Sequence, residues 1–187
     1  MRFSALKSLR TFLVAALLVM MPATGMPAPS EYQIKAVFLF NFSRFIEWPN
    51  SAFPSAEAPF IVGVFGHDPF GAELDEVVKG ESVNGHPLVV RRVDSAAEAA
   101  ECQIVFIHQS EKLRLDELLS TLGNRSTLTV SDLPGAAQRG VMIRLVTESG
   151  RVRMRINVES ARAASLTISS NLLRSAEIVS PNGGGRR

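Results

Sequence analysis

The sequence of 187 residues has little cysteine: Cys102 is the single one. One cysteine excludes a disulfide within the chain and a metal cluster held by several thiolates. Cys102 lies just before the apolar run 103–107. Because free cysteine behaves as a small hydrophobic side chain, a buried position is favoured over pairing between two chains.

A long apolar run is also missing. The run 12–21 is shorter than the roughly 20 residues that a membrane-spanning helix needs. It follows Arg2, Lys7 and Arg10 and precedes the proline-rich stretch 22–29. This order is typical of a secretory signal peptide, 1–25, with cleavage near Gly25. No cysteine directly follows the run, so we expect no lipid anchor on an N-terminal cysteine. We expect a periplasmic mature chain that does not insert into the membrane; a membrane anchor is the alternative.

The sequence has no strong excess of charge of one sign. Its 20 basic and 18 acidic residues give +2, and removal of the three basic residues in 1–25 would give −1. A chain so close to neutral is not expected to bind nucleic acid. The charges are nevertheless segregated: residues 26–138 hold 8 basic and 15 acidic residues, for −7, and residues 139–187 hold 9 and 3, for +6. With 46% hydrophobic and 20% charged residues, the chain is expected to form a globular protein with a core.

A helix is predicted from Ser30, which has Gln33 at the capping-box spacing, to Trp48-Pro49. Leu39 and Phe40 lie off its main apolar stripe. Apolar groups on more than one face indicate a helix that is buried on both sides or that offers a surface to a partner. The stripe expected to be buried comprises Ile34, Val37, Phe38, Phe42, Phe45 and Ile46.

Short apolar runs then alternate with helical segments. This alternation predicts right-handed crossovers and a largely parallel sheet covered on both faces. Residues 141–147 and 152–158 predict an antiparallel hairpin, followed by a final helix over 159–178 and a flexible tail over 180–187. The fold class is therefore α/β, a single three-layer domain over 30–179 with a C-terminal antiparallel hairpin and flanking helices. The predicted strands are 60–66, 87–93, 103–107 and 127–130, and the predicted intervening helices are 68–78, 95–101 and 111–122.

Polar side chains follow three of the predicted parallel strands, where ligands bind in open α/β sheets. Ser131 as nucleophile with a histidine base would make a hydrolase. Against this, the sequence has no G-x-S-x-G elbow, and serine and aspartate after a strand are ordinary N-caps. The histidines and aspartates match no zinc-site spacing, and Gly63, Gly66 and Gly71 do not form G-x-G-x-x-G. We therefore expect a candidate ligand crevice, without catalytic residues, metal or cofactor, at His67, Asp68, His108, Ser110, Ser131 and Asp132.

The hairpin carries alternating arginines. Arg151, Arg153 and Arg155 alternate with apolar residues, so the period of two places the three guanidinium groups on one face. Two interpretations stay open. The strand is a solvated one whose charge discourages aggregation, or it is a docking surface for an acidic partner.

Five ordered blocks of the sequence resemble the YfiR family of bacterial periplasmic proteins. The likeness covers nearly all of the chain after the signal segment, and the order of the blocks makes it more specific than any single motif above. The blocks are residues 31–49, 64–80, 102–115, 128–137 and 151–179.

The resemblance implies a regulator and not an enzyme: a repressor that binds the periplasmic sensor domain of an inner-membrane diguanylate cyclase and limits cyclic di-GMP signalling and biofilm formation. It also implies a homodimer. Candidate partner-binding residues are Phe40 and Trp48 with the three hairpin arginines, because aromatic and arginine side chains carry most interface energy. The alternative is a periplasmic small-molecule sensor or hydrolase that uses the crevice.

Family relatives often carry a cysteine near the position of Gly63, able to bridge to the equivalent of Cys102. Here that partner is absent. The resemblance therefore implies no redox control through such a bridge in this protein.

Overall fold

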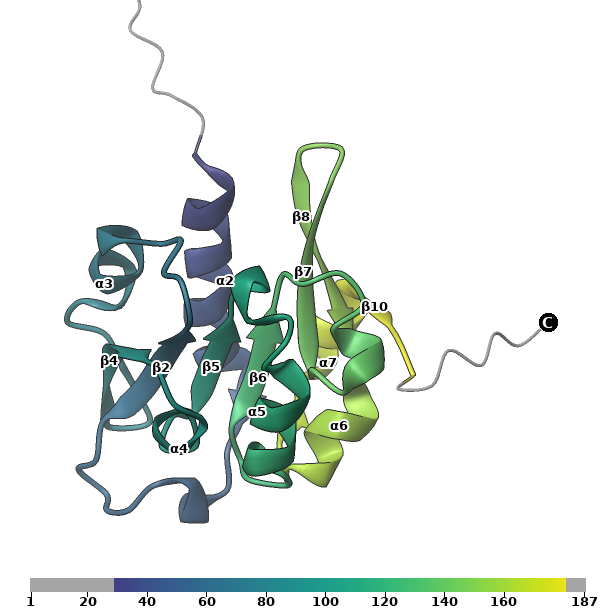
Figure 1. Cartoon of the computed structure of the whole chain (residues 1–187). Coiled ribbons are helices and arrows are strands. Elements are labelled where there is room, and N and C mark those ends of the chain that lie inside the picture. The colour runs from purple at the N-terminus through teal and green to yellow at the C-terminus, as the bar shows by residue number, and fades with distance from the viewer. Residues whose placement is uncertain (1–28, 181–187) are drawn as a thin grey trace, which may run out of the picture.

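A computed structural model describes residues 29–180. The predicted signal peptide and most of the predicted tail lie outside this range. The centre of the fold is an eight-stranded sheet in the order β10-β8-β7-β6-β5-β2-β4-β3 (Figure 1). Its strands are β2 (Phe60–Phe65), β3 (Ser82–Val83), β4 (His86–Val93), β5 (Ile104–Ile107), β6 (Leu128–Ser131), β7 (Ile143–Glu148), β8 (Arg151–Ile156) and β10 (Ala176–Ile178).

The sheet is mostly parallel. Five strands run in one direction: β4, β2, β5, β6 and β7. At the two sides of this group, β3 pairs antiparallel with β4, and β8 pairs antiparallel with β7. The predicted α/β fold and its antiparallel hairpin are thus confirmed. The four strands predicted from the alternating pattern also lie where expected, as β2, β4, β5 and β6.

Helices cover both faces of the sheet and make three layers. Along β2, Phe60 and Val62 contribute to the larger hydrophobic cluster, and Ile61 and Phe65 contribute to the smaller one. The larger cluster packs beneath α2 (Glu31–Phe45) and α3 (Ala72–Val78). The smaller cluster packs beneath α4 (Ala96–Ala99) and α5 (Leu115–Leu122). Three 3-10 turns complete the connections: η1 (Asn50–Ala52), η2 (Gln109–Glu111) and η3 (Ala137–Arg139).

The first described helix begins with the predicted capping box. The Gln33 backbone N–H donates to Ser30 Oγ at 3.2 Å, and the Ser30 N–H donates to Gln33 Oε1 at 2.7 Å. These bonds satisfy two donors that lack partners inside the helix. Within the part of the chain that the structure describes, no helix is long and apolar enough to cross a membrane.

The predicted buried stripe of α2 is partly wrong. Val37 and Phe45 are 46% and 42% exposed, whereas Leu39 is fully buried. The physical reason is Lys35, which is 2% exposed and turns inward toward carboxylates. The helix is therefore rotated about its axis relative to the purely apolar prediction, and its buried residues are Lys35, Ala36, Leu39, Phe42 and Ser43.

The predicted final helix over 159–178 is also wrong. The segment forms α6 (Val158–Ala163), β9 (Thr167–Ile168), α7 (Ser170–Arg174) and β10. Ser165 has φ +58°, a left-handed conformation that no helix continues through. Ser169 then caps a new helix by accepting from the Leu172 N–H at 3.3 Å.

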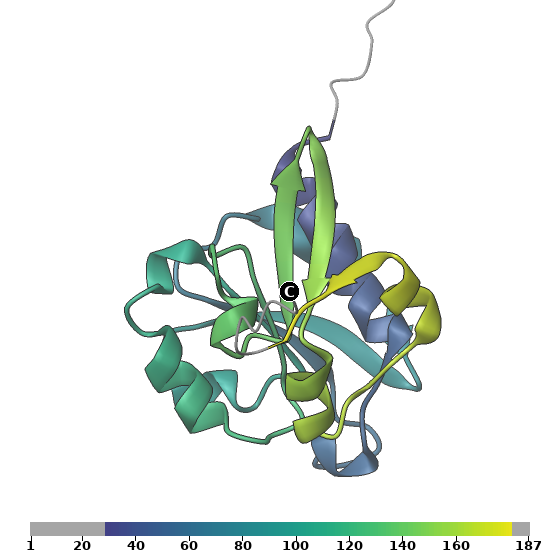
Figure 2. The same ribbon diagram turned by 90° about the vertical axis from the view of Figure 1, so that its right-hand side faces the viewer.

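Two short ladders tie this C-terminal segment to the body. β10 pairs parallel with β8 over Met154–Ile156, and β9 pairs antiparallel with β1 (Ile46–Glu47) at the end of α2. The Ser169 N–H also donates to the Phe45 carbonyl at 3.0 Å. As a result, α7 stands beside α2 and the hairpin (Figure 2).

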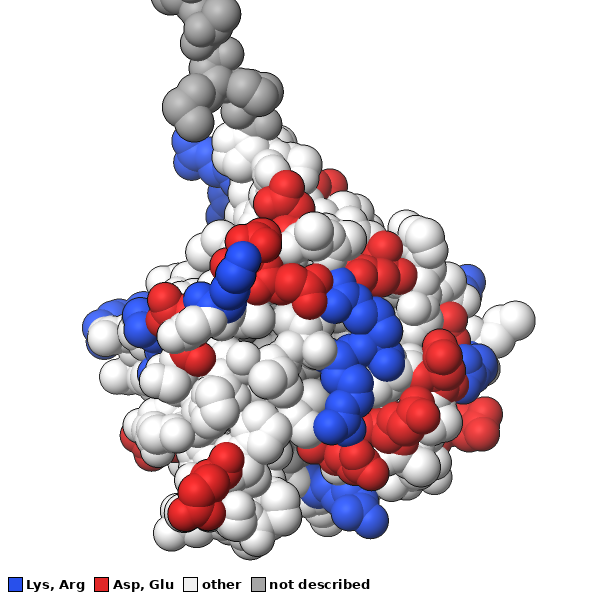
Figure 3. Space-filling view, turned by 90° about the vertical axis from the view of Figure 1, so that its left-hand side faces the viewer, with Lys and Arg blue, Asp and Glu red and all other residues white. Residues whose placement is uncertain are grey.

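Acidic and basic side chains are interleaved on the side of the molecule that carries α3 and β4 (Figure 3). Arg92 bridges Asp68 at 2.9 Å and Asp75 at 2.6 Å, and Arg91 bridges Glu101 at 2.7 Å. The excess of acidic residues over 26–138 therefore does not form one acidic patch on this side.

Candidate functional site

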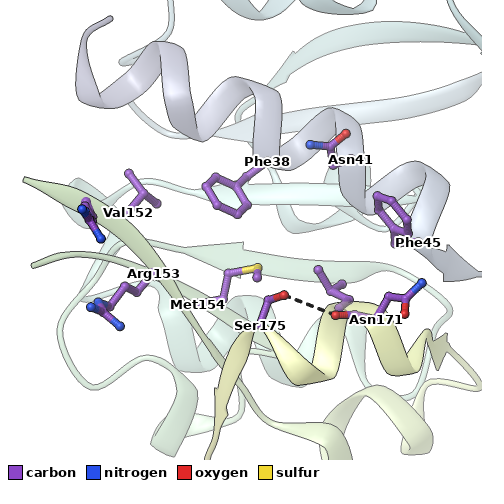
Figure 4. Close-up of a pocket in the computed structure, with 10 residues that line it drawn as sticks. Phe38, Asn41, Phe45, Val152, Arg153, Met154, Asn171 and Ser175 are labelled. Atoms are coloured by element: carbon purple, nitrogen blue, oxygen red, sulfur yellow. Dashed lines mark hydrogen bonds between the residues drawn. The ribbon is translucent and has the colours of Figure 1, made fainter. Parts of the chain in front are cut away.

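A groove lies between α2, the hairpin strand β8 and α7 (Figure 4). Its volume is about 570 Å³. Two short strand pairings hold the three walls together. The β1–β9 ladder joins α2 to α7, and the β10–β8 ladder joins α7 to the hairpin. The groove is lined by Phe38, Asn41, Phe45, Arg151, Val152, Arg153, Met154, Asn171, Leu172 and Ser175.

The wall formed by α2 is aromatic. Phe38 and Phe45 are two helical turns apart, with Asn41 between them, and both rings point from the helix toward β8 and α7 (Figure 4). Phe45 is 42% exposed although the residue is large and apolar. Met154, which is almost fully buried, contributes from β8. Exposed apolar side chains of this kind mark interaction surfaces, because their exposure to water does not stabilise the protein itself.

The rim formed by β8 is cationic. Arg151 and Arg153 lie at this edge of the groove, where the Arg153 side chain points away from Phe38 and Met154 (Figure 4). The Arg153 side chain is 64% exposed and pairs with Glu148 at 3.7 Å. Arg155 instead bridges Glu148 at 3.1 Å and Glu177 at 2.9 Å. The three arginines share one face of the strand, as predicted, but only the two near the tip of the hairpin reach the groove.

The two predicted aromatic anchors do not line this groove. Phe40 is half-buried beneath the Arg44 guanidinium, 4.8 Å from the ring centre. Trp48 packs edge-on against Phe60 with ring centres 4.9 Å apart, and its indole N–H donates to the Gln103 carbonyl at 3.2 Å. Phe38 and Phe45, which the periodicity assigned to the core, occupy the groove in their place.

Part of the predicted crevice comes together at the carboxyl ends of β2 and β5. The His67 and His108 rings lie 5.2 Å apart between centres. His108 Nδ1 is 3.1 Å from Ser110 Oγ, which donates to Glu111 at 3.0 Å. The pKa of His108 is lowered, chiefly because burial disfavours the charged ring.

Ser131 and Asp68 have structural roles. Ser131 is buried; its hydroxyl donates to the Ile107 carbonyl at 2.7 Å and accepts from the Leu133 N–H at 3.1 Å. Asp68 accepts from two backbone N–H groups of the turn before α3 and pairs with Arg92. No hydrogen bond joins Ser131 to a histidine in residues 29–180, so the hydrolase arrangement does not assemble there.

Asp132 belongs to a network that sequence reasoning missed. Its Oδ2 accepts from the Tyr32 hydroxyl at 2.9 Å and from Lys35 Nζ at 3.0 Å, and Lys35 also pairs with Glu31 at 2.6 Å. Burial and the Asp132 carboxylate raise the pKa of Tyr32. The only sequence signal was the i, i+4 spacing of Glu31 and Lys35, which normally indicates an exposed pair.

These contacts form neither a metal site nor a reactive thiol site among the described residues. Across the described range, no group of three or more histidine, cysteine, aspartate or glutamate side chains is placed to hold a metal ion. Cys102 is buried, and burial raises the pKa of its thiol to about 11.

The protein is a three-layer α/β domain with an aromatic groove between α2, β8 and α7. The family model described as YfiR/HmsC-like matches residues 32–177, so the chain belongs to the YfiR/HmsC-like family, whose members are periplasmic regulators and not enzymes. The resemblance found in the sequence is thereby confirmed. No curated protein matches the chain.

Proposed function

We propose that this protein is a periplasmic repressor that binds the periplasmic sensor domain of an inner-membrane diguanylate cyclase and lowers its cytoplasmic output, limiting cyclic di-GMP and biofilm formation. Membership of a family of regulators supports the general class. The observation that carries the proposal in this chain is the groove with exposed Phe45 and a rim of Arg151 and Arg153.

The chemistry of the groove suits a protein segment of defined character. Aromatic side chains in a concave surface provide the anchors of most interfaces, and arginines at the rim speed encounter with an acidic partner. A complementary segment would place apolar side chains against Phe38 and Phe45 and acidic side chains near Arg153. The net charge of +6 over residues 139–187 favours the same polarity of partner.

Two further features belong to the proposal. The chain is exported and cleaved near Gly25, and the mature protein is a homodimer. N-terminal sequencing of the protein recovered from a periplasmic extract tests the cleavage site. Light scattering coupled to size-exclusion chromatography tests the dimer, because it gives the molar mass independently of shape.

Cells that carry an inactivated gene, complemented with wild type or with variants, test the repressor assignment. The double variant Phe45→Ser, Arg153→Glu should raise cyclic di-GMP and biofilm as the inactivated gene does. Val37→Ser is the matched control, since Val37 is an equally exposed apolar residue of α2 that does not line the groove. The proposal fails if inactivation leaves cyclic di-GMP unchanged across growth conditions, or if the groove variant represses as well as wild type.

The alternative of a hydrolase at the crevice has less support. The hydroxyl of Ser131 is used by two backbone groups, and its hydrogen bonds leave it inside the sheet rather than facing solvent. A nucleophilic serine needs a base within hydrogen-bond reach.

A further inference from the structure

A second, polar cavity of about 280 Å³ lies where the first turn of α2 meets β7. It is separate from the groove, and of its lining residues only Asp132 was a predicted crevice residue. Charged and polar side chains dominate the lining. The residues are Glu31, Tyr32, Lys35, Gln109, Asp132, Arg144, Leu145, Val146 and Thr147.

One side of this cavity has more carboxylate groups than cations to pair with them. Lys35 Nζ lies between Glu31 at 2.6 Å and Asp132 at 3.0 Å, so one cation serves two carboxylates. The Asp132 side chain is 7% exposed, and its Oδ1 has no hydrogen-bond partner among the described residues, although Oδ2 has two. A buried carboxylate oxygen without a donor is costly, so it would bind strongly a donor that reaches it as the lining side chains shift.

The other side has an unused donor. Arg144 Nε is buried and has no acceptor within residues 29–180. The pKa of Arg144 is lowered, first by burial and then by repulsion from Arg155. A guanidinium presents several N–H groups in one plane, a geometry that matches a carboxylate.

The formal charges of the lining cancel, because two carboxylates face one ammonium and one guanidinium. They are arranged unevenly, however: surplus negative charge lies at Asp132 and surplus positive charge at Arg144. A ligand of net charge would leave one of these groups without compensation. A neutral ligand that carries both charges compensates both.

We propose that this cavity binds a small zwitterion, with its ammonium group on Asp132 Oδ1 and its carboxylate on the Arg144 guanidinium. Free amino acids are the chemical class that fits this pattern and a cavity of this size. The site requires no membrane partner, so it stands or fails separately from the repressor proposal.

Binding is tested on the protein purified from periplasm and dialysed exhaustively. Isothermal titration and thermal unfolding are measured with glycine, L-alanine, L-serine, β-alanine and 4-aminobutyrate, and with acetate and methylamine at matched ionic strength. At least one zwitterion should bind with a stoichiometry of one and raise Tm, while acetate and methylamine should do neither. Comparison of α- with ω-amino acids gives the spacing of the two charges.

Arg144→Gln and Asp132→Asn locate the site. Each should weaken zwitterion binding roughly tenfold or more, as expected for loss of one charge-assisted hydrogen bond. Arg153→Gln is the control, because Arg153 is an exposed arginine of the adjacent strand outside this cavity. Circular dichroism verifies folding, and if Asp132→Asn unfolds, Arg144→Gln decides alone.

Three results would overturn the proposal. The first is that no zwitterion binds, as expected if a water molecule bridges the two unpaired atoms. The second is that acetate alone binds equally well, which would make the site a simple anion site. The third is that Arg144→Gln binds the zwitterion with unchanged affinity.

Discussion

A Cβ atom added to Gly63 would lie 2.7 Å from Sγ of Cys102 and 3.3 Å from its Cβ. Gly63 lies in the middle of β2, and Cys102 lies two residues before β5, which pairs with β2. Cβ atoms joined by a disulfide are about 3.5–4.5 Å apart. The two positions are thus nearly at the distance that a disulfide requires. The missing side chain of Gly63 provides the space that the buried Cys102 thiol occupies.

Gly63→Cys should form a disulfide with Cys102. Closing the intervening loop should raise the free energy of unfolding by about 3–4 kcal/mol under oxidising conditions, because it restricts the unfolded chain. Thiol titration with and without reductant, together with urea unfolding, measures both effects. Two free thiols in the oxidised protein would contradict the expected geometry.

Gly63→Ala is the matched control for that experiment. It adds a methyl group against Sγ without the means to bond to it, so overpacking should lower the free energy of unfolding by about 1–3 kcal/mol. A neutral result would mean that Cys102 can move away at little cost.

Lys35→Met should destabilise the protein by about 3 kcal/mol or more. The substitution keeps most of the volume but leaves Glu31 and the buried Asp132 without their shared cation. Urea unfolding at pH 7 provides the measurement. Lys79→Met is the control, since Lys79 is 72% exposed, and it should change the free energy of unfolding by no more than about 0.5 kcal/mol. Equal effects of the two variants would argue against the buried network.

His108 should make stability depend on pH just below neutrality. Its pKa in the folded protein lies below the ordinary 6.5, mainly because of burial. Between the folded value and 6.5 the unfolded chain binds more protons, so the contribution of His108 to stability is complete above about pH 6.5 and is lost as pH falls. Urea unfolding of wild type and His108→Gln across this range measures it. The variant should show a flatter profile, and an identical slope would assign the dependence to other groups.

Cys102 should resist alkylation in the folded protein. Its thiol is buried and its pKa is raised to about 11, so very little thiolate is present at pH 8. Mass spectrometry after iodoacetamide treatment should detect almost no adduct without denaturant and complete modification in urea. Rapid labelling of the folded protein would mean that the segment around Cys102 opens readily.

Much of the fold follows from local pattern. Ser30 and Gln33 predicted the helix start because a capping box depends on residues three apart. The parallel strands were predicted because continuous apolar runs indicate strands buried on both faces. The last segment could not be predicted in the same way. Its apolar spacing suits a helix, and the turn at Ser165, closed by local backbone hydrogen bonds, has no glycine to mark it. The pairing of β10 with β8 depends on residues about twenty positions apart.

The candidate sites were harder to predict, because burial of a side chain depends on what faces it. Phe38 and Phe45 have the spacing of core residues, yet the inward turn of Lys35 rotates α2 and exposes Phe45. Asp132 was predicted as a crevice residue from its place after a strand. Its partners Tyr32 and Lys35 lie about a hundred residues earlier in the chain, and no local pattern connects them.

The pairing of β10 with β8 has a consequence for the order in which the molecule is completed. Asn171, Leu172 and Ser175 belong to the last described segment, so the α7 wall of the groove is synthesised after nearly all of the core. A chain clipped after Arg174 would keep both hydrophobic clusters but would leave the backbone of Met154–Ile156 open along one side. A single proteolytic cut there would therefore remove Ser175 and the β10–β8 pairing from the α7 wall of the groove and spare the body of the domain.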